Sequence, residues 1–252
     1  MKKILLFSLL IGLLVVTGCG QQEATTWSKI QNKGKLVVGM DAAYRPFEYH
    51  NQNDKIVGFD VDMLQAVADQ LGVKLVIKDT AWDGIIPGLK AKKYDVIASA
   101  MTITEQREKA VDFSNPYFNA GQVVAVLDSN NTIKSVDDLT GKVVGVQLGT
   151  TGDLKVSKME GIKKIKRYGK IPQAFIELQN GRLDAVVNDL PVTAAYIMKK
   201  PNVKIVGEPF TSEQYGIAIR EADDKLTKKV NAAIKKIKEN GTYDKIYNKW
   251  FK

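Results

Sequence analysis

Tyr94-Asp-Val-Ile-Ala-Ser-Ala-Met-Thr-Ile-Thr-Glu-Gln-Arg107 is the stretch from which the fold can be predicted. Its apolar run Val96–Ala98 has the length and β-branched content of a buried strand. Small and hydroxylated residues follow, and Thr104 is placed to cap a helix whose first turn ends at Arg107. A strand that passes through a polar turn into a helix is the repeating unit of α/β folds.

Arg107 stands in an unusual position, because a cation in the first turn opposes the helix dipole. An anionic ligand between the guanidinium and the free N–H groups would make this placement favourable. The guanidinium fork matches a carboxylate better than a lysine does. The alternative is a solvated Arg107 that pairs with Glu105 or Glu108, and this segment alone leaves both interpretations open.

The flanking sequence alternates strands and helices. Lys35–Gly39 and 73–77 have strand character, and an amphipathic helix ending at Gly72 lies between them. Lys142–Val146 repeats the character of Lys35–Gly39, and 178–188 repeats that of 89–99. The pattern predicts an α/β protein with two lobes of like design, each a mostly parallel sheet flanked by helices.

Composition and charge argue against several classes of protein. The 252 residues are 44% hydrophobic and 26% charged, as in ordinary globular proteins. The formal net charge is +9. The lysines are scattered, and no nucleic-acid-binding motif accompanies them. We therefore expect a lysine-rich, solvated surface and no nucleic-acid partner.

The N-terminus has the pattern of a secretory leader. A basic Met1-Lys-Lys3 precedes the apolar run 4–16, which is too short to span a bilayer. Val16-Thr-Gly-Cys19 resembles the bacterial lipobox, which implies a signal peptide at 1–18 and a lipid anchor on Cys19. As the sole cysteine, Cys19 forms no intrachain disulfide, and its alternative role is a free thiol. The polar segment 19–27 is predicted to be a tether.

Candidate ligand-binding residues follow from one rule, that open parallel sheets bind ligands beyond the carboxyl ends of their strands. In the first lobe this rule selects Asp41, Tyr44, Trp82, Ser99, Ala100, Thr102 and Arg107. In the second lobe it selects Gln147, Thr150, Thr151, Asn188 and Asp189.

Several of these candidates have two interpretations. The turn 149–152 offers N–H groups to an oxygen anion, but it lacks the lysine and spacing of a phosphate-binding loop. Asp189 either pairs with an ammonium group or caps the helix that begins at Leu190. Tyr44 and Trp82 either stack on a ligand or pack in the core. Taken together, the set is suited to a zwitterion.

Other kinds of site find no support in the sequence. It contains no Ser-His-Asp set, no His or Cys spacing typical of metal sites, and no Gly-rich cofactor fingerprint. We therefore expect no catalytic residues, no metal and no cofactor. The single histidine, His50, lies in a predicted hairpin turn and is given no role.

A series of short motifs runs nearly from end to end of the chain. They are Tyr44-Arg-Pro-Phe-Glu48, Gly58-Phe-Asp-Val-Asp62, Trp82-Asp-Gly-Ile-Ile-Pro87, Met101-Thr-Ile-Thr-Glu-Gln-Arg107, Asp112-Phe-Ser-Asn-Pro-Tyr117, Asn188-Asp189 and Asn240-Gly-Thr-Tyr243. In this order they make residues 35–252 resemble the solute-binding proteins of ABC transporters for polar amino acids, the type II "Venus flytrap" family.

The resemblance implies a periplasmic-binding-protein-like fold of two α/β lobes joined by two hinge strands. By analogy, lobe 1 comprises 28–117 and 216–252, and lobe 2 comprises 122–211. The hinges are then expected at 118–121 and 212–215.

The resemblance also implies how the main-chain groups of an amino acid are bound. Arg107 is expected to bind the α-carboxylate together with Thr102 and the backbone of Thr151. Asp189 and the Ala100 region are expected to take the α-ammonium group.

For the ligand's side chain, the resemblance implies a sandwich between Tyr44 and Trp82, with Asp41 and Gln147 at the far end. The familiar enteric glutamine binders carry a lysine at the Gln147 position and a histidine at the Asn188 position, and this chain departs from both. The acidic Asp41 favours arginine or lysine, whereas the neutral Gln147 and Asn188 favour glutamine. Of the two groups, we expect the basic amino acids.

A monomeric lipoprotein that captures an amino acid is therefore expected, anchored on the extracytoplasmic face of a Gram-positive-type membrane. Its loaded form would dock on an ABC permease with its ATPase. The alternative is an amino-acid dehydratase-like enzyme on the same scaffold. Such an enzyme needs a positioned general acid, and Asp189 can serve only if it does not neutralise an ammonium group.

Overall fold

The computed structural model describes residues 25–252. The leader at 1–18 and Cys19 lie outside the described residues. The predicted tether reaches into the described part, where helix α1 (Thr26–Lys33) has already begun. The Thr25 side chain caps this helix and Trp27 is buried. Ordered structure therefore starts before the end of the tether that the polar composition predicted.

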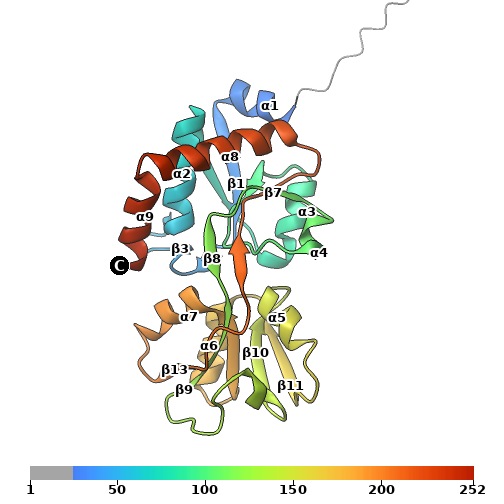
Figure 1. Cartoon of the computed structure of the whole chain (residues 1–252), viewed down its shortest axis with the longest axis vertical. Helices are drawn as coiled ribbons and strands as arrows, with labels where there is room; N and C mark the ends of the chain where they lie inside the picture. The colour runs from blue at the N-terminus through green and yellow to red at the C-terminus, as the bar shows by residue number, and fades with distance from the viewer. Residues whose placement is uncertain (1–24) are drawn as a thin grey trace, which may run out of the picture.

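Five strands form the sheet of the first lobe, in the order β5-β1-β6-β15-β7. They are β1 (Lys35–Met40), β5 (Lys74–Asp79), β6 (Val96–Ile97), β7 (Asp112–Phe113) and β15 (Ala218–Ile219). This lobe is the upper one in Figure 1, where β1 and β7 are labelled. β1 pairs in parallel with β5 and β6, whereas β15 runs antiparallel to both of its neighbours. This sheet and the helices packed on it are called lobe 1.

The sheet of the second lobe has the order β11-β10-β12-β9-β13. Its strands are β9 (Gln122–Leu127), β10 (Val143–Gln147), β11 (Lys164–Tyr168), β12 (Ala185–Asp189) and β13 (Val203–Val206). β10 is parallel to β11 and β12, and β9 is antiparallel to β12 and β13. Lobe 2 is this sheet with its helices. Each lobe thus has the mostly parallel sheet that the sequence predicted, and in each sheet one strand is reversed.

The internal repeat extends to single hydrogen bonds. In lobe 1 a carboxylate oxygen of Asp95 accepts from the backbone N–H of Val37 at 2.9 Å, and the Asp95 N–H donates to the Val37 carbonyl at 2.8 Å. In lobe 2 Asp184 makes the same two bonds to Val143, at 2.7 and 2.9 Å. The aspartate that precedes β6 therefore ties that strand to β1, and the aspartate that precedes β12 ties that strand to β10.

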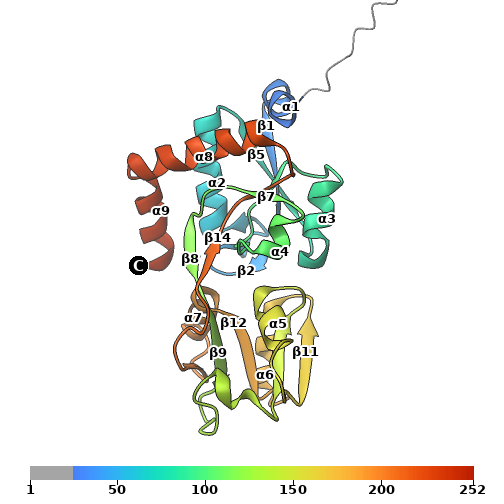
Figure 2. The ribbon, with the colours of Figure 1, turned by 45° about the vertical axis from the view of Figure 1, so that its right-hand side comes forward.

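Two antiparallel strands, β8 (Phe118–Ala120) and β14 (Glu213–Tyr215), cross between the lobes (Figure 2). The sequence predicted one strand over 215–219, and the structure divides it at Gly216. The first part pairs with β8, and the second, β15, enters the sheet of lobe 1. The division occurs because the chain changes from one sheet to another at this point.

Helices cover both faces of the sheets. Alternate residues of β1 point to opposite sides, so Leu36 packs in one core with Leu64 while Val37 packs beside Leu89. The helices of lobe 1 are α1, α2 (Phe59–Leu71), α3 (Ile85–Lys90), α4 (Glu105–Glu108), α8 (Asp224–Glu239) and α9 (Thr242–Phe251). Those of lobe 2 are α5 (Thr151–Val156), α6 (Ile171–Gln179) and α7 (Leu190–Ile197).

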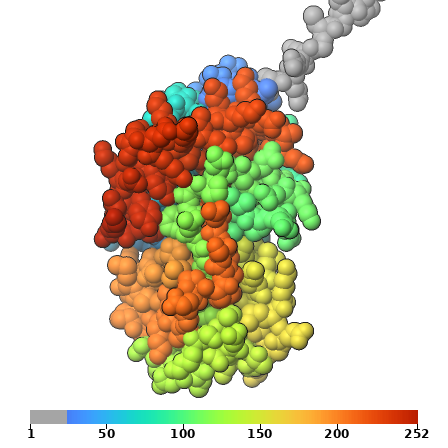
Figure 3. Space-filling model, in the orientation of Figure 1, coloured from blue at the N-terminus to red at the C-terminus, as the bar shows by residue number. Residues whose placement is uncertain are grey.

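Shorter elements complete the chain. They are the 3-10 helices η1 (Trp82–Gly84) and η2 (Val136–Leu139), and a small antiparallel sheet of β2 (Ala43–Tyr44), β3 (Glu48–His50) and β4 (Ile56–Val57). In the space-filling view the two lobes lie against each other along a seam (Figure 3). Across residues 25–252 we find no helix with the length and apolar character needed to cross a membrane.

Candidate functional site

The carboxyl ends of strands from both lobes face one small cavity at the seam. All of the predicted ligand-binding residues except Asn188 line it, together with Glu48, which had been given no role. The lining residues are Asp41, Tyr44, Glu48, Trp82, Ser99, Ala100, Thr102, Arg107, Gln147, Thr150, Thr151 and Asp189. Residues that were selected because they follow strand ends, and that lie far apart in the sequence, are therefore neighbours in the fold.

Arg107 is buried, with 8% of its surface exposed. The Thr104 side chain caps α4 by accepting from the Arg107 N–H at 3.2 Å, which fixes where the side chain starts. The Arg107 Nη1 donates to the Thr102 carbonyl at 2.7 Å, and the Arg107 Cζ lies 5.1 Å from the Trp82 ring centroid. A solvated arginine is thus excluded. Burial lowers the pKa of Arg107, against the opposing attraction of the carboxylate of Asp189.

Asp189 begins α7 by position, but its side chain does not cap the helix. Its carboxylate instead accepts hydrogen bonds from the Tyr215 hydroxyl and the Gln122 side-chain amide. Burial raises the pKa of Asp189 to about 6, and the neighbouring charge of Glu213 adds to this effect. Asp189 also lines the cavity between the lobes, where a cation would relieve the desolvation of its carboxylate.

Glu213 is a part of the site that the sequence analysis missed. It lies on the crossing strand β14 and is 7% exposed. Its Oε2 accepts from the hydroxyl of Thr102 in lobe 1 at 2.9 Å and from that of Thr151 in lobe 2 at 2.8 Å. One carboxylate thus joins both lobes through the two threonines that the sequence had assigned to a ligand carboxylate.

Asp41 and Gln147 meet across the seam. The Gln147 side-chain amide donates to Asp41 Oδ2 at 2.7 Å and to the Gly169 carbonyl at 3.1 Å. Within residues 25–252, Asp41 Oδ1 is buried and has no hydrogen-bond partner. Burial raises the pKa of Asp41 to about 6, partly offset by the hydrogen bond from Gln147. This carboxylate is thus only half satisfied, which suits it to a cationic group.

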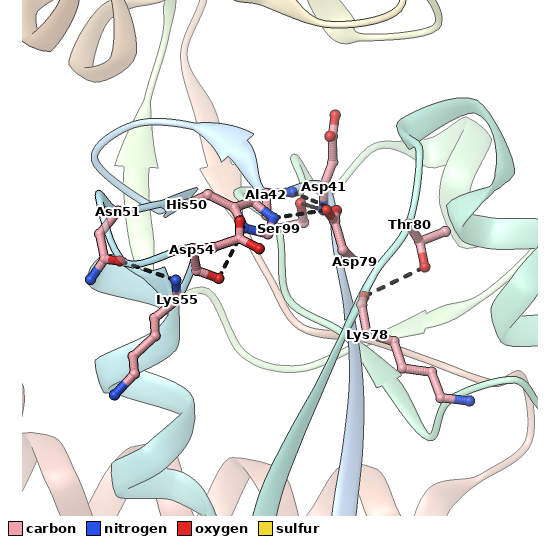
Figure 4. A network of polar contacts seen from close by, with 10 residues as sticks. All are labelled: Asp41, Ala42, His50, Asn51, Asp54, Lys55, Lys78, Asp79, Thr80 and Ser99. Carbon is pink, nitrogen blue, oxygen red and sulfur yellow. Dashed lines mark hydrogen bonds and ion pairs between the residues drawn. The ribbon is translucent and has the colours of Figure 1, made fainter.

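The backbone that carries Asp41 is held by a polar network (Figure 4). Ser99 Oγ accepts from the Asp41 N–H at 3.0 Å, and Asp79 Oδ1 accepts from the Ala42 N–H at 3.2 Å. The other oxygen of Asp79 lies 2.9 Å from His50 Nε2, and this contact raises the pKa of His50. The histidine therefore braces the loop from outside the cavity.

Two buried carboxyl groups, Glu48 and Asp60, accept hydrogen bonds from the loop at 99–100. Glu48 accepts from the Ser99 hydroxyl at 2.7 Å, and Asp60 accepts from the Ala100 N–H at 2.8 Å. Ala100 has a φ of 45°, which is unusual for a residue other than glycine. Burial raises the pKa of Asp60 to about 6, and burial next to Asp60 raises that of Glu48. These hydrogen bonds hold the strained residue in place.

Tyr44 also spans the seam, because its hydroxyl donates to Asn188 Oδ1 at 3.0 Å. Asn188 therefore contributes through Tyr44 and does not line the cavity itself. The cavity that remains has a volume of about 20 Å³, which is room for roughly one water molecule. Among the described residues, no cluster of His, Cys, Asp and Glu could hold a metal ion.

The geometry defines what the site can recognise. Of the described residues that line the cavity, Arg107 carries the positive charge, while Asp41, Glu48 and Asp189 are acidic. Hydroxyl groups and ring faces occupy the space between them. A small molecule that carries both charge types would satisfy these groups.

Comparison with known proteins agrees with this geometry. The sequence pattern of the bacterial extracellular solute-binding proteins, family 3, matches residues 36–252. A probable histidine-binding protein from Neisseria gonorrhoeae is 39% identical over 258 residues, which cover 100% of this chain and 96% of that protein.

Solved structures of amino-acid-binding proteins are also similar to this chain. A mutant of ArgBP from T. maritima superposes with a TM-score of 0.87 at 47% identity, covering 90% of this chain and 99% of that one. An ancestral arginine-binding protein bound to glutamine has a TM-score of 0.84 at 50% identity, covering 86% and 98%. The match to nearly the full length of these proteins shows both the fold and the family. The chain therefore belongs to the bacterial extracellular solute-binding proteins of family 3.

Proposed function

We propose that this protein captures a polar or basic L-amino acid between its two lobes and delivers it to an ABC importer. The observation that carries the proposal is the position of Arg107 and Asp189. One buried guanidinium from lobe 1 and one buried carboxylate from lobe 2 line the same cavity. An amino acid's α-carboxylate and α-ammonium group are their complements.

The head-group contacts follow from these positions. Arg107 binds the α-carboxylate with its guanidinium fork, assisted by Thr102 and by the N–H of Thr151 at the start of α5. Asp189 and the loop at Ala100 receive the α-ammonium group. This assignment is supported by the burial of all five residues at the lining of one cavity.

The ligand's side chain would extend between Tyr44 and Trp82 toward Asp41 and Gln147. We favour arginine or lysine, because the half-satisfied carboxylate of Asp41 needs a cation that a neutral side chain does not supply. Glutamine is the second choice, since Gln147 can hydrogen-bond an amide. Relatives support both choices. ArgBP from T. maritima was solved bound to arginine, and an ancestral arginine-binding protein was solved bound to glutamine.

Capture requires the lobes to move. The cavity of about 20 Å³ is too small to admit any amino acid, and direct hydrogen bonds such as Gln147–Asp41 cross the seam. We propose that lobe 1, as 28–117 and 216–252, rotates against lobe 2, as 122–211. The backbone would change at 118–121 and 212–215, where β8 and β14 cross.

Location and partners complete the proposal. The leader and Cys19 would place the protein on the outer face of the cell membrane as a monomeric lipoprotein. There the loaded form would meet the permease and its ATPase. The proposed role is binding alone, and the relatives reported above are named for binding.

A thermal-shift screen of the protein against the twenty amino acids tests the proposal. A ligand at a hundred times its dissociation constant stabilises the native state by about 2.7 kcal/mol, which is readily measured as a rise in melting temperature. Calorimetry on each hit would give its affinity. The expected hits are arginine and lysine, with glutamine weaker. If no amino acid shifts the melting temperature, the proposal is wrong and turnover assays for a dehydratase come first.

A further inference from the structure

A second cavity lies between the lobes, apart from the amino-acid site. Its volume is about 380 Å³, which is within the range typical of pockets for small organic molecules. Lobe 1 contributes the β2–β3 hairpin and lobe 2 contributes α6 and α7. We call it the hairpin cavity; its lining includes Arg45, Tyr49, Phe175, Tyr196, Lys199 and Lys200.

The wall that lobe 2 contributes is apolar and aromatic. Phe175 and Val192 are buried beneath the surface of the cavity. The rings of Phe175 and Tyr196 stack with centroids 4.1 Å apart and an interplanar angle of 14°. The Tyr196 hydroxyl donates to Gln179 at 2.6 Å, so its polar end is satisfied and its ring belongs to the wall. Such a wall suits a flat aromatic body.

The rim of the cavity is positively charged. Arg45, Lys199 and Lys200 line it, and none of the three forms an ion pair within residues 25–252. The Arg45 guanidinium lies 3.4 Å from the centroid of the Tyr49 ring, which fixes it at the edge of the apolar wall. Of the described residues that line the cavity, none is acidic.

His50 also lines the cavity, but its charge is already balanced. Its two ring nitrogens lie 2.8 Å from Asp54 and 2.9 Å from Asp79. The uncompensated charge therefore belongs to Arg45 and the two lysines, which come from opposite lobes.

We infer that the hairpin cavity binds a small aromatic carboxylate. The ring would lie on the apolar wall at Tyr196, which is stacked on the buried Phe175, and the carboxylate would lie between Arg45 of lobe 1 and Lys199 and Lys200 of lobe 2. Burial of the ring releases water from an apolar wall, and the guanidinium fork matches the carboxylate. Because acidic groups are missing from its described lining, the cavity disfavours the ammonium group of a free amino acid.

Calorimetry with 1-naphthaleneacetate, and with 1-naphthaleneacetamide as the uncharged analogue, tests this inference. The acid is expected to bind at least about tenfold more tightly than the amide, since one charge interaction at a partly buried site is worth roughly that factor. Arg45→Gln and the double variant Lys199→Gln/Lys200→Gln should each weaken binding of the acid about tenfold. Ala195→Trp, which fills the cavity, should abolish it.

The matched control is Lys225→Gln/Lys228→Gln on α8, which removes two charges from lobe 1 away from the cavity and should leave binding unchanged. Equal affinity for acid and amide, binding that survives Ala195→Trp, or sensitivity to the lobe 2 variants alone would each overturn the inference. So would the absence of binding. The titrations contain no amino acid, and Arg107→Ala should not alter them, so the outcome is separate from that of the proposed function.

Discussion

Glu213 Oε2 accepts hydrogen bonds from the hydroxyls of Thr102 and Thr151 at 2.9 and 2.8 Å, so a carboxylate on a crossing strand links the two lobes. Each hydroxyl has one proton to donate. A hydroxyl that donates to Glu213 cannot at the same time donate to a ligand carboxylate. While these bonds persist, the ligand's carboxylate would therefore depend on Arg107 and on the backbone N–H groups of Thr102 and Thr151.

Glu213→Gln is expected to lower the free energy of unfolding by about 1–3 kcal/mol, because it weakens hydrogen bonds to a buried charged acceptor. Urea denaturation of the protein without ligand would measure the change. Glu208→Gln is the matched control, since Glu208 is exposed a few residues away, and it should change the stability by less than about 0.5 kcal/mol. Equal stability of the two variants would contradict the bridging role.

Arg107→Ala should abolish amino-acid binding, and Arg107→Lys should weaken it by at least about thirtyfold. A lysine keeps the charge but loses the bidentate fork, and disrupting a buried charge pair costs about 2–5 kcal/mol. Calorimetry with the best ligand gives the comparison. Arg182→Ala removes an exposed arginine and should bind normally. Normal binding by Arg107→Lys would mean that the fork makes no contact with the carboxylate.

Gln147→Lys should change the ligand preference. An ammonium group at the 2.7 Å contact with Asp41 would neutralise the carboxylate that we assign to a cationic side chain. Affinity for arginine and lysine should fall at least about tenfold, whereas affinity for glutamine should fall less. Competition titrations with the three amino acids measure the ratio. An unchanged ratio would show that Asp41 does not select the ligand's side chain.

Stability and binding should depend on pH in opposite directions. The pKa values of Asp41 and Asp189 are raised to about 6 in the folded protein. Between the unfolded pKa and pH 6 the folded protein holds protons on these two groups that the unfolded chain has lost. Their contribution to the free energy of unfolding is therefore present at low pH and is lost as the pH rises through 6. As far as these two groups decide it, the protein without ligand is more stable at pH 5 than at pH 7.

A cationic ligand favours the ionised carboxylates. Binding should therefore release protons near pH 6, and affinity for arginine should rise between pH 5 and pH 7. Calorimetry at pH 6 in two buffers of different ionisation enthalpy counts the protons. Proton uptake, or an affinity that falls over this range, would be incompatible with carboxylates at both ends of the ligand.

The sequence predicted the parts of the site that follow from local pattern. Arg107 was found because a cation in the first turn of a helix needs an explanation, and the strand ends were found because apolar runs stop at polar residues. The capping alternative for Asp189 could not be decided, because the direction of its side chain depends on Tyr215 and Gln122, which are distant in the sequence.

Glu213 was missed for the same reason. Nothing near it in the sequence distinguishes it from a solvated residue, and only the fold brings it to Thr102 and Thr151. Helix α1 was not predicted, and the tether was extended to residue 27, because Trp27 interrupts a polar segment only once and its burial is a tertiary effect.

The order of strands in lobe 1 has a consequence for biogenesis. The strand β15 lies between β6 and β7, so the sheet of lobe 1 cannot be completed until the last fifth of the chain has been made. The sheet of lobe 2 uses one continuous segment, 122–206. As the chain is synthesised, N-terminus first, lobe 2 can therefore fold while the sheet of lobe 1 still lacks β15, the strand that lies between β6 and β7.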